Sequence, residues 1–285
     1  MKWQGREQSS NVDDRRGGGG RKLAVGGGLV GIIFAIVVTI ITKDPSALIQ
    51  IAQQQGSAPN TEMSAEQKQQ SDEMAEFVSV VLKDTEDVWT KLFREKLGKE
   101  YVTPTLVIFN ETVESGCGNA SAATGPFYCP ADQKVYIYLS FFNEMKEKFK
   151  APGDFACAYV IAHEVGHHVQ NLLGTSEKVS RMRDQLDEVE YNKLSVKLEL
   201  QADFYAGVWA NQANEMKNII ESGDVEEALN AANAIGDDRL QRESQGRVVP
   251  DAFTHGTSKQ RMYWFKKGFS TGDLEEGDTF NAAVL

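Results

Sequence analysis

The sequence has few of the residues that most often bind metals, because its 285 residues include only four histidines and three cysteines. No CxxC pair occurs, which argues against a zinc ribbon. Basic residues are not in excess either, since the net charge is −11 at pH 7. Nucleic-acid binding needs a basic surface that displaces phosphate counterions, so we expect no nucleic-acid partner.

Charged residues are missing from one long stretch. Residues 23–42 read LAVGGGLVGIIFAIVVTIIT, twenty residues without a charge, which matches the roughly 30 Å hydrocarbon core of a bilayer. Residues 1–22 carry six basic and three acidic side chains, and most of the basic ones directly precede the run. By the positive-inside rule, we predict a cytoplasmic basic tail over residues 1–22 and one transmembrane helix over residues 23–42.

Two alternatives are open for this run. A cleaved secretory signal has an apolar region of about 7–15 residues and a small-residue cleavage site, and no clear A-x-A follows here. A buried helix of a soluble core fits less well, because the GGG at residues 26–28 is tolerated better in lipid. We therefore expect an uncleaved membrane anchor, with the rest of the chain in the periplasm or outside the cell.

The cysteines fit an exported domain. Cys117 and Cys129 lie twelve positions apart in the loop-like stretch SGCGNASAATGPFYCP, and in an oxidising compartment we expect them to form a disulfide. The alternative is two free thiols. Cys157 lies on an apolar helix face and is expected to be a small buried residue.

The remaining chain divides into a linker and one domain. Residues 43–70 are rich in Gln, Ser and Ala and predict a flexible linker, which leaves residues 71–285 as the domain. Hydrophobic periodicity predicts a helix over residues 72–97 and, after Pro152-Gly153 with Asp154 as a candidate N-cap, another over residues 154–173.

Two alternating apolar stretches, residues 103–110 and 134–142, predict strands that form a small antiparallel sheet. Helices dominate the rest, so the expected fold class is α+β and mainly helical. The second stretch has two open interpretations: the edge strand on which a peptide substrate is added, or plain core structure.

Three of the four histidines lie in AHEVGHHVQ, residues 162–170. His163 and His167 are four residues apart, which places both imidazoles on one helix face where they can share a zinc ion. In this HExxH pattern Glu164 is the expected general base. The alternative, a hydrogen-bonded pair of core histidines, leaves more polar groups buried in an almost uncharged helix. His168 points about 100° away and is expected to support a ligand or the fold.

A catalytic zinc site usually has three protein ligands and leaves the fourth position for water. The stretch LELQADFYAG offers Glu199 as the third ligand, and Asp203, one helical turn later, as the acceptor that orients a histidine ligand. The alternative is that both are solvated surface charges. His255 is a candidate donor to the oxyanion of the tetrahedral intermediate, a fourth metal group or a surface histidine, and Arg261 and Tyr205 are weaker candidates for the donor.

The HExxH and ExxxD patterns together resemble the gluzincin group of zinc metallopeptidases. The stretches FACAYVIAHEVGHHVQNLLG, ELQADFYAGVWA and THGTSKQR are more closely similar to the bacterial neutral zinc metallopeptidase family. The resemblance implies a zincin-like domain after an N-terminal membrane segment, with Zn²⁺ bound by His163, His167 and Glu199, and with Glu164 catalytic.

We therefore predict a membrane-anchored zinc metalloendopeptidase that cleaves protein or peptide substrates in the cell envelope. One rival is a non-catalytic, zinc-stabilised scaffold that binds partners, but such a site has no use for Glu164 and normally fills all four metal positions. A second rival is a zinc hydrolase that acts on a cell-wall peptide or another amide. The sequence specifies neither the substrate nor the oligomeric state.

Overall fold

The computed structural model describes residues 1–16, 64–121 and 124–283. Four strands form its main sheet in the order β1-β2-β6-β5, and their bounds are Val12–Asp14, Thr105–Phe109, Lys134–Tyr138 and Phe127–Cys129. Strands β1, β2 and β6 are parallel, whereas β5 is antiparallel to β6. A separate antiparallel hairpin joins β3 (Thr112–Ser115) to β4 (Gly118–Ser121).

The sheet corrects the expected antiparallel arrangement of the two predicted strands. Strands β2 and β6 are parallel neighbours, with Leu106 opposite Val135. Parallel neighbours need a crossover of about a dozen or more residues, and the chain between them is long enough to contain β3, β4 and β5. Strand β6 is internal and largely buried, and the edge strand on its side of the sheet is β5.

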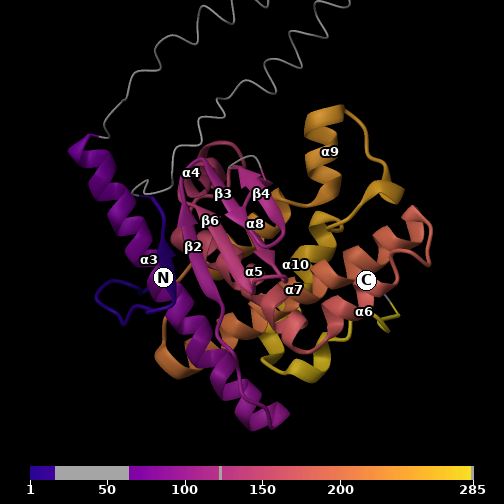
Figure 1. Ribbon diagram of the computed structural model, residues 1–285, viewed down its shortest axis with the longest axis horizontal. Coiled ribbons are helices and arrows are strands. Elements are labelled where there is room, and N and C mark those ends of the chain that lie inside the picture. Colours follow the sequence, from indigo (N-terminus) through magenta and orange to yellow (C-terminus); the bar gives the residue numbers. More distant parts are fainter. Residues whose placement is uncertain (17–63, 122–123, 284–285) are drawn as a thin grey trace, which may run out of the picture. The chain divides into compact units, whose positions relative to one another are not determined.

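Helices make up most of the described chain (Figure 1). The first, α3 (Ala65–Leu92), begins inside the predicted linker and continues as a π-helical turn over Phe93–Leu97, which ends at Gly98 with a left-handed φ of 59°. The others are α4 (Ser140–Glu147), α5 (Asp154–Leu172), α6 (Thr175–Arg181), α7 (Glu188–Lys217), α8 (Asp224–Ala234), α9 (Asp237–Gln245) and α10 (Ser258–Thr271), with 3-10 turns at Pro250–Ala252 and Leu274–Gly277. The fold is therefore α+β and mainly helical, as predicted.

Helix α5 is the central element, because it packs against α7 and α8 and also contacts β5 and β6. It spans almost the predicted residues, although its N-cap is Gly153 rather than Asp154. Helices α5 and α7 approach closely at Gly166, where an added Cβ would lie 3.0 Å from the backbone oxygen of Ala202. This close approach brings the side chains of the two helices together over one site.

The structure describes most of the predicted N-terminal tail but not the predicted membrane span. Residues 1–16 belong to the same compact unit as Ser71–Leu285, so they are part of the domain and not a separate tail. The span predicted at residues 23–42 lies outside the described residues. Within the ranges that the structure does describe, no helix combines the length and apolar character needed to cross a membrane.

The cysteine predictions are confirmed. Cys117 and Cys129 form a disulfide, which ties the turn between β3 and β4 to the end of β5. Cys157 is buried in α5, and this burial raises the pKa of its thiol. The edge strand is thus fixed on one side by its pairing with β6 and at its end by a covalent bond.

Candidate metal centre

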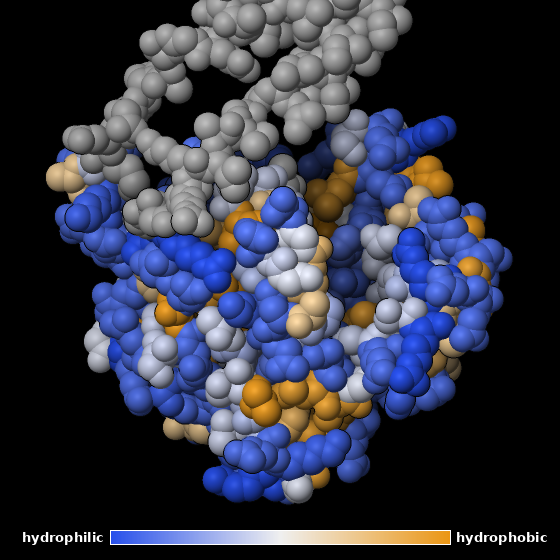
Figure 2. Space-filling view, viewed as in Figure 1, coloured by the Kyte–Doolittle hydropathy of each residue, from blue (hydrophilic) through white to orange (hydrophobic). Residues whose placement is uncertain are grey.

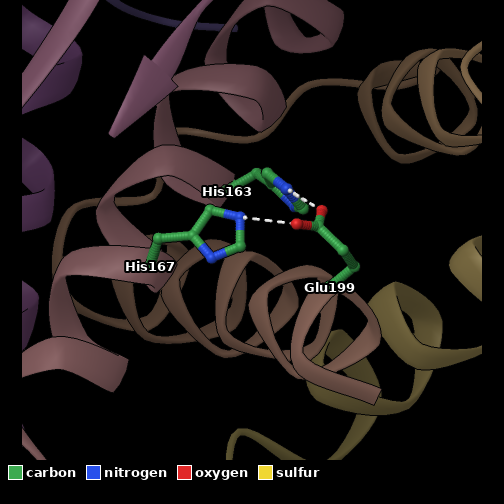
Figure 3. A group of neighbouring side chains, drawn as sticks. All are labelled: His163, His167 and Glu199. Carbon is green, nitrogen blue, oxygen red and sulfur yellow. Dashed lines mark hydrogen bonds and ion pairs between the residues drawn. The ribbon is translucent and has the colours of Figure 1, made fainter. Parts of the chain in front are cut away.

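Helices α5 and α7 place three side chains so that they point toward one another (Figure 3). His163 and His167 come from α5 because their spacing of four residues puts both rings on one helix face. Glu199 comes from α7, which crosses α5 beside Gly166. The structure therefore brings together all three residues that the sequence predicts as metal ligands.

The Glu199 carboxylate lies between the two imidazoles. Its Oε2 is 3.2 Å from Nε2 of His163, and its Oε1 is 3.4 Å from Nε2 of His167. One potential ligand atom from each residue lies within 4.8 Å of the other two. Two imidazole nitrogens and a carboxylate are a usual protein ligand set for a catalytic zinc ion, so these residues fit zinc.

The electrostatics of the three groups are strongly coupled. Burial favours the neutral imidazole, but the carboxylates of Asp203 and Glu199 outweigh it and raise the pKa of His163 to about 10. The pKa of His167 is also raised, by Glu199, against the same effect of burial. Burial opposes ionisation of Glu199, yet the two histidines hold its pKa well below the usual range. Metal binding here would release protons, because imidazole ligands must be neutral.

His163 is oriented by a buried cluster around Asp203. Nδ1 of His163 lies 2.8 Å from Oδ1 of Asp203, as expected for the residue that fixes the tautomer of a ligand. Arg261 donates to both oxygens of Asp203, and the Tyr159 hydroxyl donates to Oδ1. Burial raises the pKa of Asp203, but Arg261 and His163 reverse this and hold it at about 2. Asp203 is therefore an anion throughout the physiological range.

His167 is oriented by Gln170, which the sequence analysis did not identify. Nδ1 of His167 lies 2.9 Å from Oε1 of Gln170, and Nε2 of Gln170 donates to the backbone oxygen of Leu198. Gln170 is fully buried and also donates to Gln201. One amide thus links the second histidine to the turn of α7 that carries Glu199. The signal that the sequence offered for this role was the position of Gln170, three residues after His167.

Replacing Gln170 by leucine is expected to weaken zinc binding by about 10–100-fold, the usual effect of losing a hydrogen-bond partner of a metal ligand. The affinity is measured by competition with a chromogenic chelator. Gln201→Leu is the matched control, because it disturbs the same amide network without removing the contact between Gln170 and His167. Equal losses in both variants would contradict a specific role for Gln170.

Glu164 and His255 line the same cavity as the candidate ligands. The cavity has a volume of about 540 Å³, and Figure 2 shows the surface hollowed between the strands and helix α9. Glu164 is one of the lining residues and is almost completely buried. The walls come from β5, α5, α6, α7 and α9 and include the largely apolar set Phe127, Tyr128, Val160, Val179, Leu198 and Leu240.

His255 precedes α10 and is held by Asp237 at the start of α9. Oδ1 of Asp237 lies 3.2 Å from Nδ1 of His255, and Oδ2 accepts from three backbone N–H groups, those of Thr254, His255 and Gly256. The Asp237 carboxylate accepts a hydrogen bond from the protonated ring and so raises the pKa of His255. Nothing in the sequence pattern indicated Asp237, because it contacts the loop only after α9 and α10 have packed.

The side chains of the other predicted candidates have other partners. His168 is fully buried, and its ring contacts the Tyr128 hydroxyl at 3.0 Å and the backbone oxygen of Val102 at 2.6 Å, so it supports the fold. The guanidinium of Arg261 is used by Asp203. Tyr205 packs edge-on against Trp89 in the core. Of the three donor candidates, His255 therefore has the most available side chain.

Comparisons with known proteins agree with this geometry. The chain is 49% identical over 299 residues to the Escherichia coli K12 protein called "Uncharacterized protein YpfJ", with 100% of each chain covered. It is 43% identical over 195 residues to the Mycobacterium bovis "Uncharacterized protein Mb2605" and the Mycobacterium tuberculosis "Uncharacterized protein Rv2575", with 65% of each chain covered. No solved structure matches.

The family comparison covers nearly the whole chain. The sequence profile described as "Putative neutral zinc metallopeptidase" matches residues 1–280, including α5, α7 and the loop that carries His255. The predicted resemblance is therefore confirmed, and the chain belongs to this family of neutral zinc metallopeptidases.

Proposed function

We propose that this protein is a zinc-dependent endopeptidase that hydrolyses peptide bonds in the cell envelope. The observation that carries the proposal is the position of Glu164 in the same cavity as His163, His167 and Glu199. A purely structural zinc site needs neither a buried base nor an open cavity of about 540 Å³. A hydrolytic site needs both, since water and substrate must reach the metal.

The residues of the chain have separable roles in this reaction. When bound, zinc supplies a Lewis acid that polarises the scissile carbonyl and acidifies water. Glu164 accepts the proton of the attacking water and passes it to the leaving amine. Asp203 and Gln170 accept hydrogen bonds from the Nδ1–H groups of the two histidines, which leaves both Nε2 atoms for the metal.

A peptide substrate is supported by the edge strand β5 (Phe127–Cys129). Among the strands that the structure describes, β5 pairs only with β6, and Phe127 and Tyr128 also line the cavity. An extended peptide can add to such an edge through backbone hydrogen bonds while its side chains enter the pocket beside it. The apolar wall favours a substrate with a hydrophobic side chain next to the scissile bond.

The location in the cell envelope rests on two features. The Cys117–Cys129 disulfide is typical of proteins in oxidising compartments such as the periplasm or the cell exterior. The charge-free run at residues 23–42 is long enough to attach the protein to a membrane. We therefore propose a membrane-attached enzyme whose domain faces an oxidising compartment.

An activity screen tests this proposal directly. Purified, zinc-loaded protein is incubated with casein, unstructured peptides and muropeptides, each with and without a chelator. We expect chelator-sensitive cleavage of casein or the peptides at internal bonds. Cleavage of muropeptides alone would establish a cell-wall amidase instead, and no cleavage of any substrate by protein that contains stoichiometric zinc would favour a scaffold.

His255 is expected to act as the donor that stabilises the oxyanion, so His255→Ala should lower kcat by about 10²–10³-fold. The donor is strongest as imidazolium, which is present below the raised pKa of His255 and is lost as the pH rises through it. In Asp237→Asn the pKa falls, so the alkaline limb of kcat/KM against pH should move to lower pH. A pH profile that matches wild type would show that the pair is structural.

A further inference from the structure

Residues 1–16 complete the main sheet of the metallopeptidase domain. Strand β1 lies parallel to β2, with Val12 opposite Leu106 and Asp13 opposite Val107. Backbone hydrogen bonds to β2 continue past both ends of the strand, from Leu106 N to Asn11 O and from Arg15 N to Ile108 O. The segment therefore occupies the edge of the sheet opposite β5.

Charged groups fix the segment at several buried points. Both terminal nitrogens of Arg6 bond Asp84, at 2.8 and 2.5 Å, and Asp84 is 1% exposed. Ser9 donates to buried Glu86 at 2.6 Å. The α-ammonium of Met1 lies 2.7 Å from the Asp154 carboxylate and 3.2 Å from that of Asp224.

These contacts show that the domain depends on the segment. Without the segment, Asp84 would retain Lys217 and Asp224 would retain the backbone N–H of Glu221, but Glu86 would lose its hydrogen bonds from Ser9 and Asn11. Burying a carboxylate without a partner is strongly unfavourable. The domain is therefore more stable with the segment in place than without it. The edge-on contact of Trp3 with Phe77 of α3 adds apolar burial to the same interface.

The packing restricts how the chain can be arranged at a membrane. A single crossing by residues 23–42 would put residues 1–16 and the domain on opposite faces of the bilayer, but the two form one body. Among the described residues, two of the arginines that suggest a cytoplasmic tail are ion-paired: Arg15 with Asp13, and Arg16 with Asp14 and Asp72. Their charges are thus partly neutralised within the fold.

We propose that the N-terminal segment, residues 1–16, lies on the same side of the membrane as the metal centre. This arrangement replaces the single-pass orientation expected from the sequence. It depends on the packing of residues 1–16 and not on peptidase activity, so it can be tested separately from the proposed function.

Cysteine labelling tests on which side each part lies. Gln8→Cys places a thiol on the exposed surface of the N-terminal segment, and Lys99→Cys places one on the exposed surface of the domain. The unsubstituted protein is the control, because its cysteines are disulfide-bonded or buried. A membrane-impermeant maleimide is applied to intact cells, to sealed inverted vesicles and to permeabilised samples. We expect both variants to react in the same preparations, and reaction from opposite sides would overturn the proposal.

A double-mutant cycle tests whether the segment is packed in the full-length protein. Arg6→Ala should lower the thermal midpoint by about 5 °C, because it removes a buried, charge-assisted contact. In an Asp84→Asn background the same change should lower it much less. Lys193→Ala, which removes an exposed pair with Glu190, is the matched control and should have little effect. Additive effects of Arg6→Ala and Asp84→Asn would show that the segment is not docked and would overturn the proposal.

Discussion

Replacing Glu164 by glutamine is expected to lower kcat by about 10²–10⁴-fold, the usual contribution of a positioned general base. Glutamine has nearly the same shape as glutamate but cannot accept the proton of the attacking water. The three candidate ligands are unchanged, and their polar partners, Asp203 and Gln170, contact the histidines and not Glu164. The variant should therefore bind one zinc ion per chain with wild-type affinity.

Two measurements separate loss of the base from other causes. Metal analysis and a thermal midpoint equal to wild type show that the site and fold persist. Glu147→Gln, a change of the same chemistry at an exposed position on α4, should retain full activity. Full activity in Glu164→Gln would rule out the assigned mechanism, whereas loss of zinc in that variant would assign Glu164 to metal binding.

The part of the site that the sequence predicted is the part fixed by local helix geometry. His163 and His167 must share a face of α5 at a spacing of four residues, wherever the helix lies. Glu199 and Asp203 are related in the same way on α7. The contact between the two helices had to be inferred. The reason for inferring it was that a catalytic zinc site needs a third protein ligand.

The features that the sequence did not predict depend on contacts between distant segments. Asp237 meets His255 only after α9 and the loop before α10 have packed. The parallel pairing of β2 and β6 depends on a long crossover, which leaves no short hairpin signal. Gln170 was the exception, because it lies on the same helix as His167 and its position was visible in the pattern.

The N-terminal segment shows why charge alone is an ambiguous signal. Basic residues before an apolar run predict a cytoplasmic tail when they are free in solution. Here Arg6 and Arg16 contact carboxylates that are distant in the sequence, Asp84 and Asp72. The sequence shows the number of positive charges, but only the fold shows that their partners belong to the domain.

Removing the carboxylate of Glu199 is expected to abolish stoichiometric zinc binding and with it all peptidase activity. Glu199→Ala leaves two histidines, and the affinity should fall by more than the roughly 10–100-fold that follows loss of a partner outside the ligand set, as in Gln170→Leu. His163→Ala should behave in the same way. Glu215→Ala, at an exposed position on the same helix, is the matched control and should retain one zinc ion per chain.

The electrostatics of the centre predict an additional signature for Glu199→Ala. Glu199 contributes to the raised pKa of both histidines, so its removal lowers both values and favours neutral imidazoles in the metal-free protein. The protons released per zinc ion bound, measured by calorimetry in buffers of different ionisation enthalpy, should be clear in wild type and fewer in the variant, in which Asp203 still raises the pKa of His163. Wild-type zinc content together with wild-type proton release in Glu199→Ala would exclude Glu199 as the third ligand.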